Sequence, residues 1–198
     1  MMTSSRPLLL LAACALSLGL SGCAVFAKPD DTVRCPDTGL IQDAATMTVF
    51  AEDSAQTLEN VVMQGKLDNY GGGCTYKDGM VEFVLELDVA AAQGPKGRTL
   101  KSGQFPYFVA VLGPDEEVLQ RQSFSTTVPF DNVPPAAPVD ASRTMAVRPG
   151  KSGVMIEQHH LRLPAENKAD LHTHKVVIGF ELTPAQLAFN RDQPVKKK

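Results

Sequence analysis

Alternation of apolar and polar residues is the dominant pattern along this chain. From Val81 to Val89 the odd-numbered positions are apolar, whereas Glu82, Glu86 and Asp88 fall on the opposite face. A period of two residues predicts a β-strand with one face in the core and the other in water. We therefore interpret the three carboxylates as a solvated face rather than as a catalytic pair, which requires a cleft around it.

The same period recurs over most of the chain between residues 35 and 190. Further strands are predicted over Thr46–Glu52, Val61–Leu67, Phe105–Leu112, Val118–Phe130, Thr144–Val147, Val154–Leu163 and Lys175–Leu182. Asp78-Gly79 favours a hairpin turn. The Asp68-Asn69 pair and Gly71–Gly73 are expected to end the strand that precedes them. Residues 133–140 are expected to form a proline-rich loop.

One short helix is predicted near the C-terminus. Thr183 can cap the first amides, Pro184 occupies the first helical position and Gln186 can reach back as in a capping box. The helix should end near Asn190. Together these elements predict an all-β fold, an immunoglobulin-like or fibronectin-like β-sandwich with a short C-terminal helix, spanning residues 35–190 as one domain.

The segment Phe105–Leu112 is apolar on both of its faces, as expected for a central strand that is covered twice. Either the C-terminal helix covers its outer face through Leu187 and Phe189, or another protein does. We favour internal cover. In the second case Tyr107 and Phe108 are the candidate partner surface.

The N-terminus has the layout of a secretory signal. An apolar run of about 13 residues follows Arg6 and ends in Leu20-Ser21-Gly22-Cys23. It is shorter than the ~20 residues that a membrane-spanning helix needs. The segment resembles a bacterial lipoprotein signal, which implies cleavage before Cys23 and acylation of that cysteine. The alternative is an ordinary cleaved signal with an incidental cysteine.

Under the lipoprotein interpretation, residues 1–22 are the signal peptide and residues 23–34 a lipidated tether. The resemblance also implies sorting to the outer membrane, with the domain facing the periplasm, because Ala24 stands where an aspartate would retain the protein in the inner membrane. Several acyl chains on one residue anchor a protein stably.

Charge argues against nucleic acid as a partner. The chain has 19 Lys and Arg against 22 Asp and Glu, a net charge of −3, and its only cationic run is Lys196–Lys198. We interpret the tail over residues 191–198 as a solvated end, with weak contact to an anionic surface as the alternative.

Cys35 and Cys74 are expected to form a disulfide, because an envelope compartment oxidises thiols. Neither stands in a Cys-x-x-Cys pair or close to a histidine, which argues against a metal or redox role. In the chain-entropy model a bridge over this separation is worth about 4 kcal/mol.

All four histidines lie in the last quarter of the chain: His159, His160, His172 and His174. On a strand, His172 and His174 would share a face and suit zinc or copper. If Leu163 pairs opposite His174, however, His160 lies about 10 Å away along its strand, too far for the same ion. We therefore favour solvent-facing histidines in a hairpin over a metal site, and predict no cofactor.

Three segments resemble a family of small, uncharacterised bacterial outer-membrane lipoproteins. They are Cys35-Pro36-Asp37-Thr38-Gly39-Leu40-Ile41, Pro106-Tyr107-Phe108-Val109-Ala110-Val111 and Gly179-Phe180-Glu181-Leu182-Thr183-Pro184-Ala185-Gln186-Leu187. The resemblance implies anchoring and no activity. The cysteine-proline segment is also similar to an accessory lipoprotein of outer-membrane barrel-assembly machinery, which makes such envelope proteins candidate partners.

The sequence nominates no catalytic residues, since it lacks a Gly-x-Ser-x-Gly nucleophile elbow and its carboxylates lie on a wet face. The leading hypothesis is a membrane-anchored, non-enzymatic lipoprotein that serves as a protein-interaction or structural module of the envelope. A periplasmic metal-binding lipoprotein that uses the histidines is the alternative, and a hydrolase with a site in its loops is a third.

Overall fold

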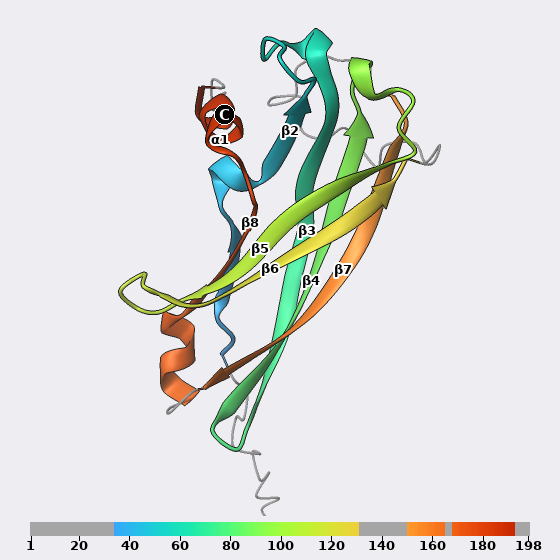
Figure 1. Cartoon of the computed structure of the whole chain (residues 1–198). Coiled ribbons are helices and arrows are strands. Elements are labelled where there is room, and N and C mark those ends of the chain that lie inside the picture. Colours follow the sequence, from blue (N-terminus) through green and yellow to red (C-terminus); the bar gives the residue numbers. More distant parts are fainter. Residues whose placement is uncertain (1–33, 131–149, 165–167, 193–198) are drawn as a thin grey trace, which may run out of the picture. The chain divides into compact units, whose positions relative to one another are not determined.

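The structure is a computed structural model that describes residues 34–130, 150–164 and 168–192. The predicted signal peptide, Cys23, the strand over Thr144–Val147, the proline-rich loop and Lys196–Lys198 lie outside these residues. Within them the chain forms two four-stranded sheets, in the orders β1-β8-β5-β6 and β2-β3-β4-β7 (Figure 1). The strands are β1 (Asp37–Leu40), β2 (Thr46–Phe50), β3 (Val61–Lys77), β4 (Met80–Gln93), β5 (Ser102–Leu112), β6 (Val118–Pro129), β7 (Ser152–Pro164) and β8 (Lys175–Phe180).

The β3–β4 hairpin forms the centre of one sheet. Its turn is the predicted one: Asp78 and Gly79 have φ values of 52° and 75°, and Lys77 pairs with Met80. The expectation that the strand before it ends at Leu67 is wrong. β3 continues to the turn because an irregularity between Asp68 and Gly71 absorbs two residues as a bulge, after which the glycines pair with β4.

The other sheet contains the β5–β6 hairpin and one parallel pair that the sequence pattern did not predict. β1 runs parallel to β8, with Leu40 opposite Ile178. β1 has only four residues, too few for a periodic signal. In the described residues, four short 3-10 helices lie between strands: η1 (Gln42–Ala44), η2 (Leu58–Asn60), η3 (Pro95–Gly97) and η4 (Lys168–Thr173).

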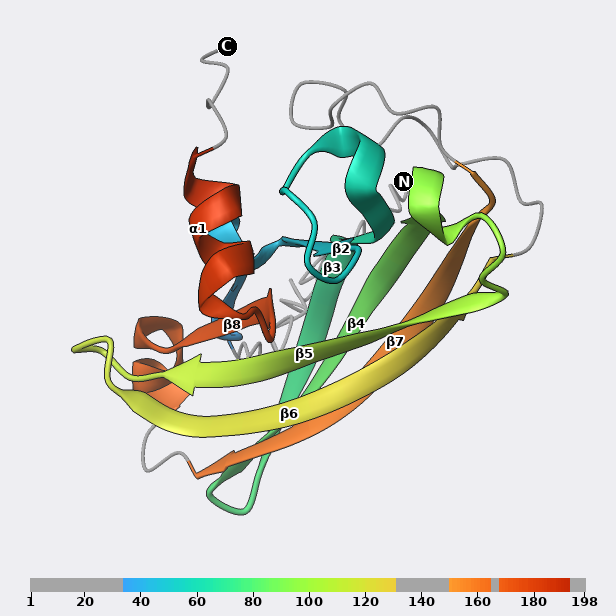
Figure 2. The same ribbon diagram turned by 45° about the horizontal axis from the view of Figure 1, so that its top comes forward.

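The core lies between the two sheets. Strands β5 and β6 cross β3 and β4 obliquely, and β6 runs alongside β7 (Figures 1 and 2). The apolar positions of β4 face inward as predicted and are fully buried: Val81, Phe83, Leu85, Leu87 and Val89. Each sheet buries its apolar face against the other, which confirms the all-β sandwich. The strand order does not confirm the immunoglobulin-like or fibronectin-like subtype.

Gly65 is a point of close approach between the sheets. A Cβ atom on Gly65 of β3 would lie 2.6 Å from the ring of Phe105 in β5 and 3.2 Å from that of Phe180 in β8. The absence of a side chain here allows two aromatic rings to reach the backbone of the opposite sheet.

The C-terminal helix α1 (Pro184–Asp192) begins with the predicted capping box. The Thr183 amide donates to Oε1 of Gln186 at 2.9 Å, and the Gln186 amide donates to the Thr183 hydroxyl at 3.2 Å. The helix packs against β2 and η1, where Phe189 contacts Phe50 edge to face at 5.0 Å. Phe189 therefore covers β2 rather than β5, which corrects the favoured expectation.

Candidate functional site

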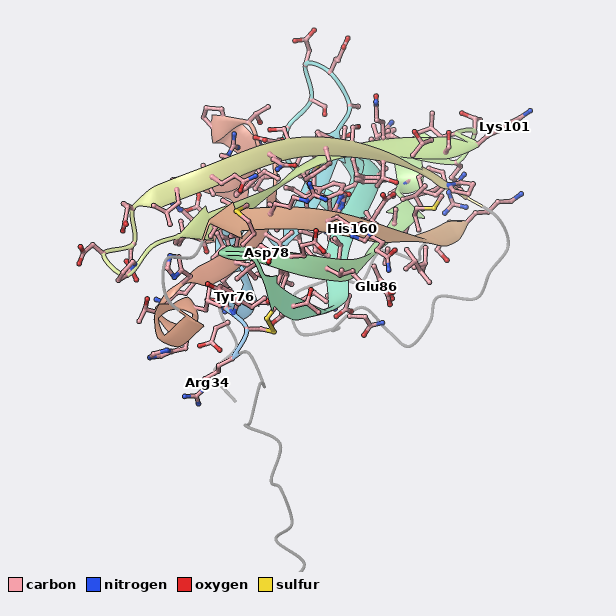
Figure 3. The ribbon with its side chains drawn as sticks, turned by 90° about the horizontal axis from the view of Figure 1, so that it is seen from below. Arg34, Tyr76, Asp78, Glu86, Lys101 and His160 are labelled. Carbon is pink, nitrogen blue, oxygen red and sulfur yellow. A yellow bond between two sulfur atoms is a disulfide. The ribbon has the colours of Figure 1, made fainter. Side chains whose placement is uncertain are left out.

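The predicted disulfide between Cys35 and Cys74 is confirmed, with the two Cα atoms 5.6 Å apart. It joins the first described residues to β3 near its turn, so that Arg34, Tyr76 and Asp78 lie at the same end of the domain (Figure 3). The bond closes a 39-residue separation and fixes where the chain enters the sandwich. The predicted lipidation site, Cys23, lies outside the described residues.

The four histidines do not gather. β7 pairs with β4, while β8 pairs with β5 and β1, so the hairpin assumed from the sequence does not form. His159 and His160 lie on opposite faces of β7, His172 is exposed in η4 and His174 directly precedes β8. Over residues 34–130, 150–164 and 168–192, no three His, Cys, Asp or Glu residues are grouped as a metal site requires.

His159 instead belongs to a polar cluster between the sheets. Its Nε2 atom lies 2.6 Å from the hydroxyl of Tyr107, which comes from β5 of the opposite sheet. The ring of Phe124 in β6 lies 4.0 Å from the imidazole, centroid to centroid, and 5.6 Å from the Tyr107 ring. Side chains from both sheets thus meet where the edge strands β6 and β7 face each other.

Glu157 adds a carboxylate to this cluster and accepts a hydrogen bond from the hydroxyl of Thr126. Burial raises the pKa of Tyr107 far above its ordinary value, and the charge of Glu157 and a hydrogen bond to it act in the same direction. Burial lowers the pKa of His159; Glu157 opposes this shift and His160 adds to it. Both shifts favour the neutral phenol and the neutral imidazole, as expected for a hydrogen-bonded contact between the two sheets.

Tyr107 is 1% exposed, so it lies in the core and cannot line a partner surface as hypothesised. The reason is geometric: neighbouring strand residues point to opposite faces, and only Phe108 points outward. The guanidinium of Arg121 covers Phe108, 4.4 Å from the ring centroid, and donates to both carboxylate oxygens of Glu181 at 2.8 Å. The Ser123 hydroxyl also donates to Glu181.

Exposed apolar side chains also occur on the outer face of the other sheet. Ile156 and Val154 of β7 are 65% and 40% exposed, and Val154 pairs with Ala90 of β4. We call these three residues the β7 face. Charged groups border it, including Asp68, which forms an ion pair with Lys66 at 2.7 Å.

The carboxylates predicted to be solvated lie on the same side of the sheet as the β7 face. Glu82 and Glu86 are exposed and Asp88 is half-buried, while Arg162 approaches Glu82 to 3.3 Å. Glu86 and His160 are labelled in Figure 3. The solvated-face interpretation of Glu82 and Glu86 is confirmed.

Reasoning from the sequence missed the cluster around His159. The sequence nonetheless contained an indication of this cluster. Glu157 and His159 occupy odd-numbered positions of the strand, as the core residues Leu161 and Leu163 do, and therefore point to the same face. Two polar residues at inward positions of an amphipathic strand need polar partners. Those partners, from β5 and β6, cannot be chosen until the sheets are assembled.

No protein-family model matches this chain, and a search of the curated proteins finds no match either. In the part of the chain that the structure describes, no helix has the length and apolarity required to cross a membrane.

Proposed function

We propose that this chain is a lipoprotein anchored through Cys23 in the outer membrane, with its sandwich facing the periplasm. In this proposal the domain acts as a non-enzymatic protein-interaction or structural module of the cell envelope. The signal-like segment that ends at Cys23 supports the location. The Cys35–Cys74 disulfide is typical of an oxidising compartment and agrees with it.

The β7 face is the observation that carries the interaction role. Two branched apolar side chains, Ile156 and Val154, stand in solvent on one strand. Contiguous exposed apolar residues rimmed by charge are typical of protein contact sites. The partner that we propose is another envelope protein, with the outer-membrane barrel-assembly machinery as the first candidate.

Site-specific photocrosslinking in intact cells tests this role. A photoreactive residue in place of Ile156 should give a discrete crosslinked product, whereas the same residue in place of Ser125, exposed on β6 of the other sheet, should give none. Equal labelling at both positions, or none at Ile156 in correctly folded protein, would contradict an interaction through the β7 face.

The anchor requires a separate test. Labelled palmitate should enter the protein and should be lost in Cys23→Ser, while Cys35→Ser should retain the label. Absence of label in the unchanged protein would remove the proposed location but leave the β7 face to be judged by crosslinking.

A further inference from the structure

Helix α1 occupies the free edge of strand β2. The side-chain amide of Gln186 donates to the Thr48 carbonyl at 3.0 Å, and that of Asn190 donates to the Thr46 carbonyl at 2.9 Å. Residues two apart on an edge strand direct their carbonyls to the same side, here away from β3. The two amides therefore stand where the N–H groups of a neighbouring strand would stand. Figures 1 and 2 both show α1 beside β2.

The strand beneath the helix lacks the charged residues and prolines that protect many edges, although it is short and its register with β3 shifts between Val49 and Phe50. β2 reads Thr46-Met47-Thr48-Val49-Phe50, with no charge and no proline and with high strand propensity throughout. The longer edge strands β6 and β7 carry such residues. β6 contains Arg121 and ends at Pro129, and β7 contains several charged and histidine side chains. In β2, α1 therefore takes the place of these protective residues.

The attachment of α1 is weak. No residue of this nine-residue helix is buried, and a helix of this length is marginal in isolation. Besides the two amides, Asn190 also donates to the Asp43 carbonyl, Arg191 pairs with Asp43 at 3.1 Å, and Phe189 contacts Phe50. Exposed ion pairs of this kind contribute little. The helix can therefore leave without opening the core.

We propose that β2 is a strand-pairing surface that α1 occupies in the monomer and that the β2 strand of a second copy occupies when α1 is displaced. Antiparallel pairing about a two-fold axis at Thr48 would place Thr48 opposite its own copy and Met47 opposite Val49 of the second copy. Every such pair is uncharged, so no repulsion opposes the contact. The two β2-β3-β4-β7 sheets would join edge to edge. This proposal does not depend on the lipid anchor or on the β7 face.

Disulfide trapping in the full-length protein provides the test. The variant Gln186→Ala/Phe189→Ala/Asn190→Ala releases the helix, and Thr48→Cys places a thiol on the proposed axis. Directly opposed residues in a hydrogen-bonded antiparallel pair have Cα atoms about 5.5 Å apart, which suits a disulfide. Mild oxidation should convert most of the combined variant to a covalent dimer on a non-reducing gel. Thr48→Cys with α1 unchanged should give only a trace.

Two controls distinguish strand pairing from unspecific association. Ser125→Cys on β6, in the released background, should not crosslink. Thr48→Pro in that background removes an N–H that points away from β3, so the protein should stay folded but lose the self-association seen as added mass in sedimentation. A released variant that keeps its circular dichroism spectrum and shows no trapping at Thr48→Cys overturns the proposal. So does a Thr48→Pro variant that associates as strongly as its parent.

Discussion

The phenol of Tyr107 and the imidazole of His159 join the two sheets of the sandwich directly, with Oη and Nε2 2.6 Å apart. The core between the sheets is mainly apolar, and this polar contact joins one residue of β5 to one residue of β7. Its removal should cost stability, because the half-buried imidazole of His159 would lose its partner and keep part of its desolvation penalty.

Tyr107→Phe should lower the free energy of unfolding by about 1–3 kcal/mol, since it leaves Nε2 of His159 without the phenol. Urea denaturation followed by circular dichroism measures this change. The matched control is Tyr70→Phe, which removes the same hydroxyl from a ring that is 41% exposed and should be neutral. Equal effects at the two positions would show that the contact contributes nothing specific.

Stability should fall as the pH decreases through the range below about 6.5, and His159 should be responsible. Burial holds the pKa of His159 below its ordinary value of 6.5, despite the opposing effect of Glu157. The unfolded chain therefore binds more protons than the native state in this range, so the free energy of unfolding rises with pH there and is fully retained above it.

Urea midpoints at pH 7.5, 6.5 and 5.5 measure this dependence. His159→Gln should flatten it, whereas His172→Gln, at an exposed position in η4, should leave it unchanged. If both variants keep the slope of the unchanged protein, another group causes the pH dependence.

Loss of the Cys35–Cys74 disulfide should destabilise the domain by about 4 kcal/mol in the chain-entropy model for its 39-residue separation. The variant Cys35→Ser/Cys74→Ser should unfold at lower urea than the oxidised protein and should no longer respond to a reducing agent. A reductant-sensitive midpoint in the double variant would point to another thiol.

Gly65→Ala should destabilise the fold by about 1–3 kcal/mol through overpacking, because its Cβ would meet Phe105 at 2.6 Å. Gly73→Ala on the same strand is the matched control, since no atom lies within 4 Å of the Cβ it would add. It should be neutral or slightly stabilising. Thermal or urea unfolding of the pair checks this, and a neutral Gly65→Ala would mean that the two aromatic rings can move.

The sequence was most informative where the determining interactions are local. Alternation in β4, the Asp78-Gly79 turn and the capping box of α1 each depend on residues a few positions apart, and the structure confirms all three. The predicted end of β3 failed because residues 68–73 read as a stop, whereas pairing with β4 carries the strand through them. Local turn propensity was overridden by a cross-strand ladder.

By itself, the sequence determined that this chain folds as a β-sandwich, because period-two burial is a property of the chain alone. It also predicted that Cys35 and Cys74 pair, but with four cysteines in the chain that prediction depended on the lipoprotein interpretation of the signal. Only the tertiary structure decided that Tyr107 meets His159, that the histidines separate, and that α1 lies on β2 rather than over Phe108. These contacts join strands from different sheets or residues far apart in sequence. Their geometry depends on strand order, which alternation along a single chain does not encode.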